Sequence, residues 1–181
     1  MELSKETAIL EAILLLESEP VTLDQLAKIA KLDRTVIESC VGVLNERYAD
    51  EAHGIELVQL AEGYVLQPKL ELWENLRDRY GKRNENKLSR AAIETLSIIA
   101  YSQPITRAEI EGLRGVSPDG MIRLLLQREL IQEIGRKDAP GRPVQYGTTN
   151  EFLKLFRLAS IKDLPRLDEQ DRRRFELEDS E

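Results

Sequence analysis

The chain has 181 residues, of which 41% are hydrophobic and 33% are charged, so it is long enough for one large domain or two small ones. Its net charge of -7 repels nucleic-acid phosphates unless basic residues gather on one face. The single cysteine, Cys40, excludes an internal disulfide and suits a reducing cytosol.

The N-terminal stretch 1–20 contains a largely apolar run of nine residues, but it has no basic leader and no small-residue cleavage site. It is also too short to span a bilayer, so we expect a soluble cytoplasmic protein. A helix here carries two apolar stripes: an expected core stripe (Ile9, Ala12, Ile13, Leu16) and a second one at i, i+4 (Leu10, Leu14). The second stripe needs cover, either from an adjoining copy of the chain at a dimer interface or from the first wing.

The next segment carries the signals of a helix-turn-helix. Thr22 and Gln25 have the spacing of a capping box, and Val21 and Leu26 have that of a hydrophobic staple. Asp33 is the expected N-cap of a third helix that ends near residue 47. Two alternating segments, 55–60 and 64–67, then predict a hairpin around Glu62-Gly63, and the apolar spacing in 70–80 predicts a helix that either packs on this wing or binds a partner.

A second copy of this pattern follows the polar segment 81–87, which we interpret as a linker. Shifting the sequence by 84 residues places Ile9 on Ile93 and Thr22 on Thr106 without a gap. A helix is predicted over 90–101, with Ile93, Leu96, Ile99 and Ala100 on its apolar face, and Pro104 ends it.

Thr106 and Glu109 repeat the capping box at the start of the next helix, which Gly115 closes. Ser117-Pro118 opens a third helix. A wing follows, with strands at 130–134 and 144–148 joined through a turn centred on Pro140-Gly141, and a short helix at 151–158 closes the domain.

The predicted fold class is therefore mainly α with small β-hairpins (α+β), arranged as two tandem winged-helix domains. The N-terminal domain covers 1–80, with dimerisation as its expected role, and the C-terminal domain covers 88–165. The charged segment 166–181 has almost nothing to bury and is predicted to be a disordered tail.

Catalytic chemistry has little support in this sequence. His53 is the only histidine and lies in a polar turn, while Cys40 lies on an apolar helix face with no basic neighbour. One histidine and one cysteine do not make a usual zinc site, and no glycine-rich phosphate loop is present. We expect no enzyme activity, no cofactor and no metal.

DNA binding is the usual role of a helix-turn-helix, but the charge balance argues against it here. The window 107–142 has a net charge of only +1, from seven basic residues (Arg107, Arg114, Arg123, Arg128, Arg136, Lys137, Arg142) and six acidic ones (Glu109, Glu111, Asp119, Glu129, Glu133, Asp138). A protein that makes about 6 to 10 phosphate contacts needs a far more one-sided charge than this. The basic cluster around the second wing (Arg136, Lys137, Arg142) is open to three interpretations: a DNA contact, a contact to acidic side chains of a partner, or a solvated turn.

Two blocks, LSRAAIETLSIIAYSQPITRAEIEGLRGV at 88–116 and GRKDAPGRPVQYGTTNEFL at 135–153, resemble the segregation and condensation protein B family, in the same order and separation. The resemblance implies a homodimer of tandem winged helices that binds the kleisin subunit, segregation and condensation protein A, and through it the SMC ATPase. The implied function is a non-enzymatic accessory subunit of the bacterial condensin complex, for chromosome condensation and segregation in the nucleoid.

The family motifs include five residues that lack an evident structural role, so they are the expected kleisin-binding residues: Tyr101, Arg107, Arg114, Arg136 and Arg142. The expected dimer-interface residues are Leu10 and Leu14. We expect weak or absent direct DNA binding and no membrane association. The alternative hypothesis is a winged-helix transcription regulator that binds DNA.

Overall fold

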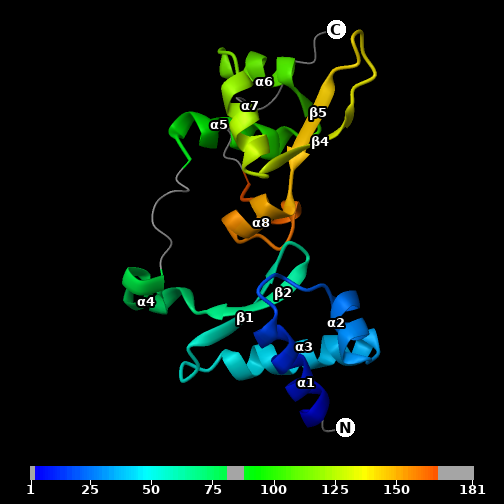
Figure 1. Cartoon of the computed structure of the whole chain (residues 1–181), viewed down its shortest axis with the longest axis vertical. Helices are drawn as coiled ribbons and strands as arrows, with labels where there is room; N and C mark the ends of the chain where they lie inside the picture. Colours follow the sequence, from blue (N-terminus) through cyan, green and yellow to red (C-terminus); the bar gives the residue numbers. More distant parts are fainter. Residues whose placement is uncertain (1–2, 81–87, 167–181) are drawn as a thin grey trace. The chain divides into compact units, whose positions relative to one another are not determined.

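A computed structural model of the chain describes residues 3–80 and 88–166. The chain divides into two compact units, residues 1–85 and 86–181, each built from helices followed by a hairpin (Figure 1). This architecture confirms the predicted fold class. The predicted linker at 81–87 and the predicted tail, from residue 167 onward, lie outside the described residues.

The N-terminal unit begins with three helices, continues with an antiparallel hairpin and closes with a short helical segment. Its elements are α1 (Ser4–Leu16), α2 (Leu23–Ala30), α3 (Arg34–Tyr48), β1 (Ile55–Leu60), β2 (Gly63–Pro68), η1 (Leu70–Leu72) and α4 (Trp73–Tyr80). The predicted capping box at the start of α2 is present, because the Thr22 hydroxyl accepts from the Gln25 amide and the Gln25 side chain accepts from the Thr22 amide. Asp33 precedes α3 as predicted, but its side chain makes no capping hydrogen bond.

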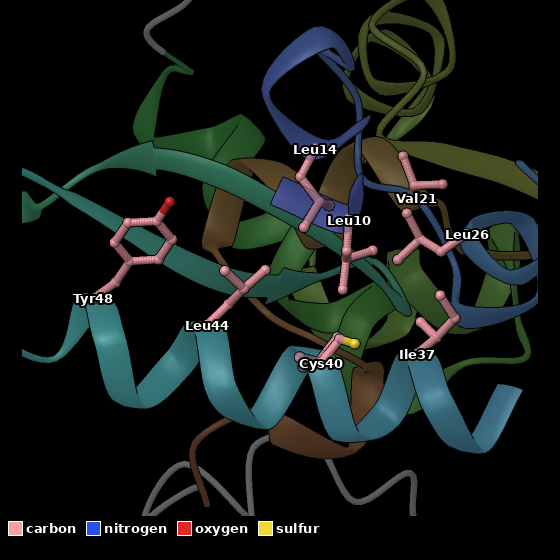
Figure 2. Close-up of a cluster of buried hydrophobic side chains, with 9 residues drawn as sticks. Leu10, Leu14, Val21, Leu26, Ile37, Cys40, Leu44 and Tyr48 are labelled. Atoms are coloured by element: carbon pink, nitrogen blue, oxygen red, sulfur yellow. The ribbon is translucent and has the colours of Figure 1, made fainter. Parts of the chain in front are cut away.

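The core of this unit lies between α1, α2, α3 and the hairpin. In Figure 2, α3 presents Ile37, Cys40, Leu44 and Tyr48 toward Leu10 and Leu14 of α1 and toward Val21 and Leu26. Leu10 and Leu14 have exposed fractions of 0% and 1%. The expectation that these two leucines form an outward dimer stripe is therefore wrong: α3 and the rest of the unit already cover them within one chain.

The first wing turns through Ala61 and Glu62, which both have positive φ (47° and 64°). The prediction placed this turn one residue later, on Glu62-Gly63. Gly63 instead opens β2 and lies against the loop before α2, where an added Cβ would come within 2.8 Å of Pro20 and Val21 backbone atoms. Glycine is therefore required at residue 63 by a close backbone approach and not by the turn.

The C-terminal unit repeats this order with an additional strand. Its elements are α5 (Arg90–Ser102), β3 (Ile105–Thr106), α6 (Arg107–Arg114), α7 (Asp119–Gln127), β4 (Ile131–Arg136), β5 (Val144–Thr148), α8 (Asn150–Phe156) and η2 (Ile161–Asp163). The predicted capping box of Thr106 and Glu109 is present, and Gly115 ends α6 at φ 70°. The short strand β3 pairs with β5, so the sheet has the order β3-β5-β4.

Two local predictions in this unit need correction. Ile93 is 47% exposed, and Ala92, Thr95 and Ile98 are buried in addition to the predicted core residues of α5. Ser117 does not cap α7 through its side chain, because its hydroxyl bonds the Asp119 carboxylate at 3.0 Å and the helix begins at Asp119. The sequence pattern therefore predicted where α5 and α7 lie, but it assigned one exposed residue of α5 to the core and misassigned the capping residue of α7.

Candidate protein-binding site

The helix-turn-helix of the C-terminal unit is held by an ion pair between its two helices. Arg107, the first residue of α6, donates from Nη2 to Asp119 Oδ2 at 2.9 Å and from Nε to Asp119 Oδ1, and Asp119 is the first residue of α7. Its Nη1 also donates to Glu111 at 2.8 Å. The hydrogen bonds from Arg107 lower the pKa of Asp119 to about 2, and the same contact raises the pKa of Arg107. Arg107 therefore has a structural role that the sequence did not reveal.

The wing of this unit is fastened to the same capping box. Lys137 donates to Glu109 at 2.6 Å, and Glu109 also accepts from the amide and hydroxyl of Thr106. Burial acts to raise the pKa of Glu109, but the hydrogen bonds from Lys137 and Thr106 outweigh it, so its pKa is lowered. The Glu109 carboxylate thus links the start of α6 to the loop end of the wing.

The wing apex leaves two arginines at the surface. Gly141 and Arg142 have positive φ (80° and 42°), and Arg136 Nη1 donates to the Arg142 carbonyl at 3.2 Å. Both side chains belong to exposed residues. Arg107 and Lys137 are engaged by the chain's own carboxylates, whereas the guanidinium groups of Arg136 and Arg142 lie exposed at the wing apex.

Arg114 lies at the end of α6 with only 6% of its side chain exposed, and its Nη2 is 3.8 Å from Glu94 of α5. Its Nε is buried and has no hydrogen-bond partner. The Arg114 guanidinium therefore packs between α6 and α5, and little of its surface is accessible to a binding partner.

Tyr101 lies in the last turn of α5 and donates its hydroxyl proton to the Pro165 carbonyl at 2.8 Å. The ring lines an open hollow of about 700 Å³ together with Ile161, Lys162 and Leu164. The structure therefore places Tyr101 beside the segment that follows α8. The described geometry brings Arg136 and Arg142 together on the wing.

In the N-terminal unit, α1 carries an apolar surface that is left exposed by the rest of residues 3–80. Ile9, Leu15 and Leu16 are 37%, 73% and 85% exposed. Ala8 and Ala12 are also exposed and lie on the same side at helical spacing. We call this set (Ala8, Ile9, Ala12, Leu15, Leu16) the outer α1 stripe. The sequence prediction assigned Ile9, Ala12 and Leu16 to the core, whereas the structure turns them outward.

The segment after the first wing is similarly uncovered. No residue of α4 or η1 is buried, and Trp73 and Tyr80 are 38% and 65% exposed. These exposures do not decide between the two alternatives for residues 70–80, packing on its own wing or binding a partner, and both stay predictions.

The residues considered for catalysis have structural explanations. Cys40 is fully buried in the N-terminal core, and the His53 ring meets Tyr48 edge-on with centroids 5.4 Å apart. Within residues 3–80 and 88–166, no group of three or more His, Cys, Asp or Glu residues is placed to hold a metal ion. In the same ranges, no helix has the length and apolar character needed to cross a membrane.

Residues 8–167 match the sequence profile of a known family, described as segregation and condensation complex subunit ScpB. The chain belongs to this family. It is 46% identical over 162 residues to segregation and condensation protein B of Syntrophotalea carbinolica, across 90% of this chain and 82% of that protein. It is 45% identical over 160 residues to the protein of the same name from Desulforamulus reducens, across 88% of each chain.

A solved structure entitled a dimer of the ScpB N-terminal domain complexed with ScpA peptide is also similar, with 26% identity and a TM-score of 0.41. The match covers 43% of this chain and 98% of that one. Another solved structure, ScpB from Mycobacterium tuberculosis, has 32% identity and a TM-score of 0.41, across 86% of this chain and 97% of that one. The ScpB assignment itself depends on the family profile and the sequence identities.

Within this member of the ScpB family, the five predicted kleisin-binding residues divide into two groups. Arg107 and Arg114 are held by Asp119, Glu111 and Glu94, so their motif positions have a structural explanation. Tyr101, Arg136 and Arg142 lie at the surface or line a hollow, and they stay candidates for partner contact. The outer α1 stripe was not predicted, because Ile9, Ala12 and Leu16 were assigned to the core and Leu15 to no stripe.

Proposed function

We propose that this chain is a non-enzymatic, homodimeric accessory subunit of a bacterial SMC condensin complex, which binds the kleisin subunit in chromosome condensation and segregation. Its place would be on the nucleoid, through the kleisin and the SMC ATPase. The observation that carries the proposal is the internal neutralisation of the helix-turn-helix: Arg107 is bound to Asp119, and Lys137 to Glu109. These are positions from which a DNA-binding winged helix would use free cations against phosphates.

The C-terminal unit is the proposed kleisin-binding unit. Arg136 and Arg142 offer guanidinium groups at the wing apex that suit carboxylates of an incoming segment, and such charge-assisted hydrogen bonds are stronger than neutral ones. Tyr101 adds an aromatic contact beside the hollow at the end of α5. Arg107 and Arg114 act in this proposal by fixing the helices that present these contacts.

The kleisin proposal is tested by calorimetry with the purified full chain and the kleisin subunit from the same organism. Arg136→Glu with Arg142→Glu should weaken binding by about tenfold or more, equivalent to about 1.4 kcal/mol per tenfold. The matched control is Arg77→Glu with Arg79→Glu, the same change of charge on exposed residues of α4. If the wing variant binds normally, the wing is not the site, and a loss in the control alone would place the site in the N-terminal unit.

The same samples test the DNA-binding alternative. The wild-type chain should bind duplex DNA weakly and without sequence preference, because the described cations of the helix-turn-helix are largely paired. Tight binding that falls steeply with salt would instead support the transcription regulator.

The N-terminal unit is the proposed dimerisation unit, through the outer α1 stripe in place of Leu10 and Leu14. An exposed stripe of large aliphatic side chains is stabilised when a second copy covers it, because burial removes apolar surface from water. The two-fold symmetry of a homodimer would place the same stripe on both sides of the interface.

Sedimentation velocity tests this arrangement. Leu15→Glu with Leu16→Glu should give a folded monomer, whereas Val43→Glu, a change at a 40% exposed position on α3, should leave the dimer intact. Leu10→Glu should unfold the unit, because it places a charge in the core. A dimer that survives the double change at Leu15 and Leu16 would exclude the outer α1 stripe as its interface.

A further inference from the structure

The hollow at the end of α5 combines apolar and cationic side chains. It is lined by Ala100 and Tyr101 of α5 and by five residues of the segment 161–166, two of which are cations, Lys162 and Arg166. No carboxylate of the described residues lines it, although the chain as a whole has 33 acidic and 26 basic residues. We call it the α5 hollow. Its lining therefore has the opposite charge balance to the rest of the chain.

The segment that forms one side of the α5 hollow is fastened at both ends. After α8, the Leu158 amide donates to the Leu153 carbonyl at 2.8 Å. Further along, the Tyr101 hydroxyl donates to the Pro165 carbonyl at 2.8 Å. The backbone that carries the two cations is thus held in place before a partner arrives, which reduces the entropy that binding would cost.

The acidic residue closest to the two cations in sequence, Asp163, is directed elsewhere. Its carboxylate accepts hydrogen bonds from the Ser160 amide and hydroxyl at 2.8 and 3.0 Å, and it does not line the α5 hollow. Lys162 and Arg166 both belong to exposed residues. A carboxylate of a partner that entered the hollow would therefore meet two accessible cations, and charge-assisted hydrogen bonds to them are stronger than neutral ones.

The apolar part of the lining favours a polypeptide over a nucleic acid. Ile161 and Leu164 are half-buried, and they line the hollow together with the Tyr101 ring. An apolar side chain placed against them would be removed from water, which stabilises the bound state. A phosphate backbone has no such side chain, and its binding relies on more cationic contacts than these two residues supply.

We propose that the α5 hollow binds an acidic polypeptide segment that carries at least one apolar side chain. The apolar side chain would pack against Tyr101, Ile161 and Leu164, and the carboxylates of the segment would bind Lys162 and Arg166. The inference rests on the proposed function, in which the kleisin subunit supplies this segment. It adds two binding residues, Lys162 and Arg166, that are separate from the arginines of the wing apex.

Calorimetry with the full chain and the kleisin subunit from the same organism tests the two cations. Lys162→Glu with Arg166→Glu should weaken binding by about tenfold or more, because like charges across an interface repel. Lys162→Arg with Arg166→Lys should keep most of the affinity, since both charges remain. Normal binding by the double glutamate variant would overturn the proposal. An equal loss in the control, Arg77→Glu with Arg79→Glu, would also overturn it, because binding would then follow net charge alone.

Methyl NMR on the full chain tests whether the contact is direct. Adding the kleisin subunit should shift the methyl signals of Ile161 and Leu164, while that of Ile93, near the start of α5, should change far less. Unchanged signals at Ile161 and Leu164 would overturn the proposal. The same holds if these signals respond to duplex DNA, or to removal of residues 167–181, and not to the kleisin.

The two proposals can fail separately in these experiments. A wild-type chain that does not bind the kleisin would overturn both of them. If Arg136→Glu with Arg142→Glu abolishes binding while Lys162→Glu with Arg166→Glu binds normally, only the α5 hollow is excluded, and the proposed function stands.

Discussion

The two units of this chain join their second and third helices by the same kind of ion pair with the charges reversed. In the N-terminal unit, Arg34 at the start of α3 binds Asp24 of α2 and Glu38 one turn further along α3. In the C-terminal unit the arginine is on the second helix, since Arg107 of α6 binds Asp119 of α7. Both units therefore have an ion pair between the second and third helices, but the arginine lies on the third helix in one unit and on the second helix in the other.

The units differ more in what they leave at the surface. Both units pair the wing with the residues before the second helix, through Val21 with Tyr64 in the first and β3 with β5 in the second. The N-terminal unit exposes aliphatic side chains on α1, whereas the C-terminal unit ties Lys137 of its wing to Glu109. The duplicated framework therefore supports two different surfaces, an apolar one suited to a second copy and a polar one suited to a charged segment. The two units therefore share their helix caps and their buried core, and they differ in the surface residues on which their proposed roles depend.

The largest expected effect tests the shared core. The shift of 84 residues places Leu14 on Ile98, and these residues are 1% and 2% exposed. Leu14→Ala or Ile98→Ala should each destabilise its own unit by about 2–5 kcal/mol through lost burial and the cavity left behind. Hydrogen exchange read by mass spectrometry resolves the two units, and Leu16→Ala, at an 85% exposed position, is the matched control. If Leu16→Ala and Leu14→Ala lowered the free energy of unfolding by similar amounts, the assignment of Leu14 to the buried side of α1 and Leu16 to the exposed side would be wrong.

The second expected effect compares two equivalent glycines, Gly63 and Gly147, which the same shift superimposes. A Cβ at residue 63 would meet backbone atoms of Pro20 and Val21 at 2.8 Å, whereas at residue 147 it would meet the side-chain ends of Gln103 and Ile134. Because side chains can move aside, Gly63→Ala should cost about 1–3 kcal/mol and Gly147→Ala less. Denaturant unfolding of each variant gives the values, and the reverse order would show that the first wing can shift away from its loop.

The third expected effect compares the two capping boxes. Thr22→Ala and Thr106→Ala should each cost about 0.5–2 kcal/mol, since each removes a hydroxyl that accepts from a helix amide. Thr106→Ala should cost more, because Thr106 is 3% exposed and shares the Glu109 carboxylate with Lys137. Thr→Ser at either residue keeps the cap and serves as the control. Equal losses would mean that the link to the wing adds nothing to the cap.

The smallest expected effect is a pH dependence of the α6–α7 ion pair. The pKa of Asp119 is lowered from 3.8 to about 2, so its stabilising effect is fully present above pH 3.8 and is lost as the pH falls through about 2. Asp119→Asn should therefore lower the thermal midpoint of the C-terminal unit at neutral pH, and the difference from wild type should shrink across this window. Calorimetric scans at several pH values measure it, and a constant difference would exclude Asp119 as the titrating group.

The sequence predicted those features that depend on near neighbours. Both capping boxes span only three residues, so Thr22 with Gln25 and Thr106 with Glu109 could be recognised from spacing alone. Spacing alone could not predict which side of α1 is buried. Leu10 and Leu14 are flanked by Ile9, Ile13, Leu15 and Leu16, and in a helix that is apolar on several sides the pattern does not identify one buried face. The two-residue strand β3 and the Ala61-Glu62 turn carry no strong propensity signal.

The candidate site was predicted less well than the fold. Its residues were chosen for having no evident structural role. Arg107 has one partner on its own helix, Glu111, but Asp119 lies twelve residues away on the next helix, and the partner of Arg114 lies on α5. Such partners depend on tertiary packing, which no local pattern contains. Choosing residues without an evident structural role therefore kept Arg107 and Arg114, whose contacts within the fold explain them. Arg136 and Arg142 at the wing apex stay predictions.

The reversed polarity of the two ion pairs also limits how the halves of this chain can be confused during folding. Tandem domains of similar sequence are prone to exchange equivalent segments. If α2 associated with α7, Asp24 would face Asp119, and if α6 associated with α3, Arg107 would face Arg34. Each hybrid would place like charges together, so each second helix distinguishes its own third helix from the other one.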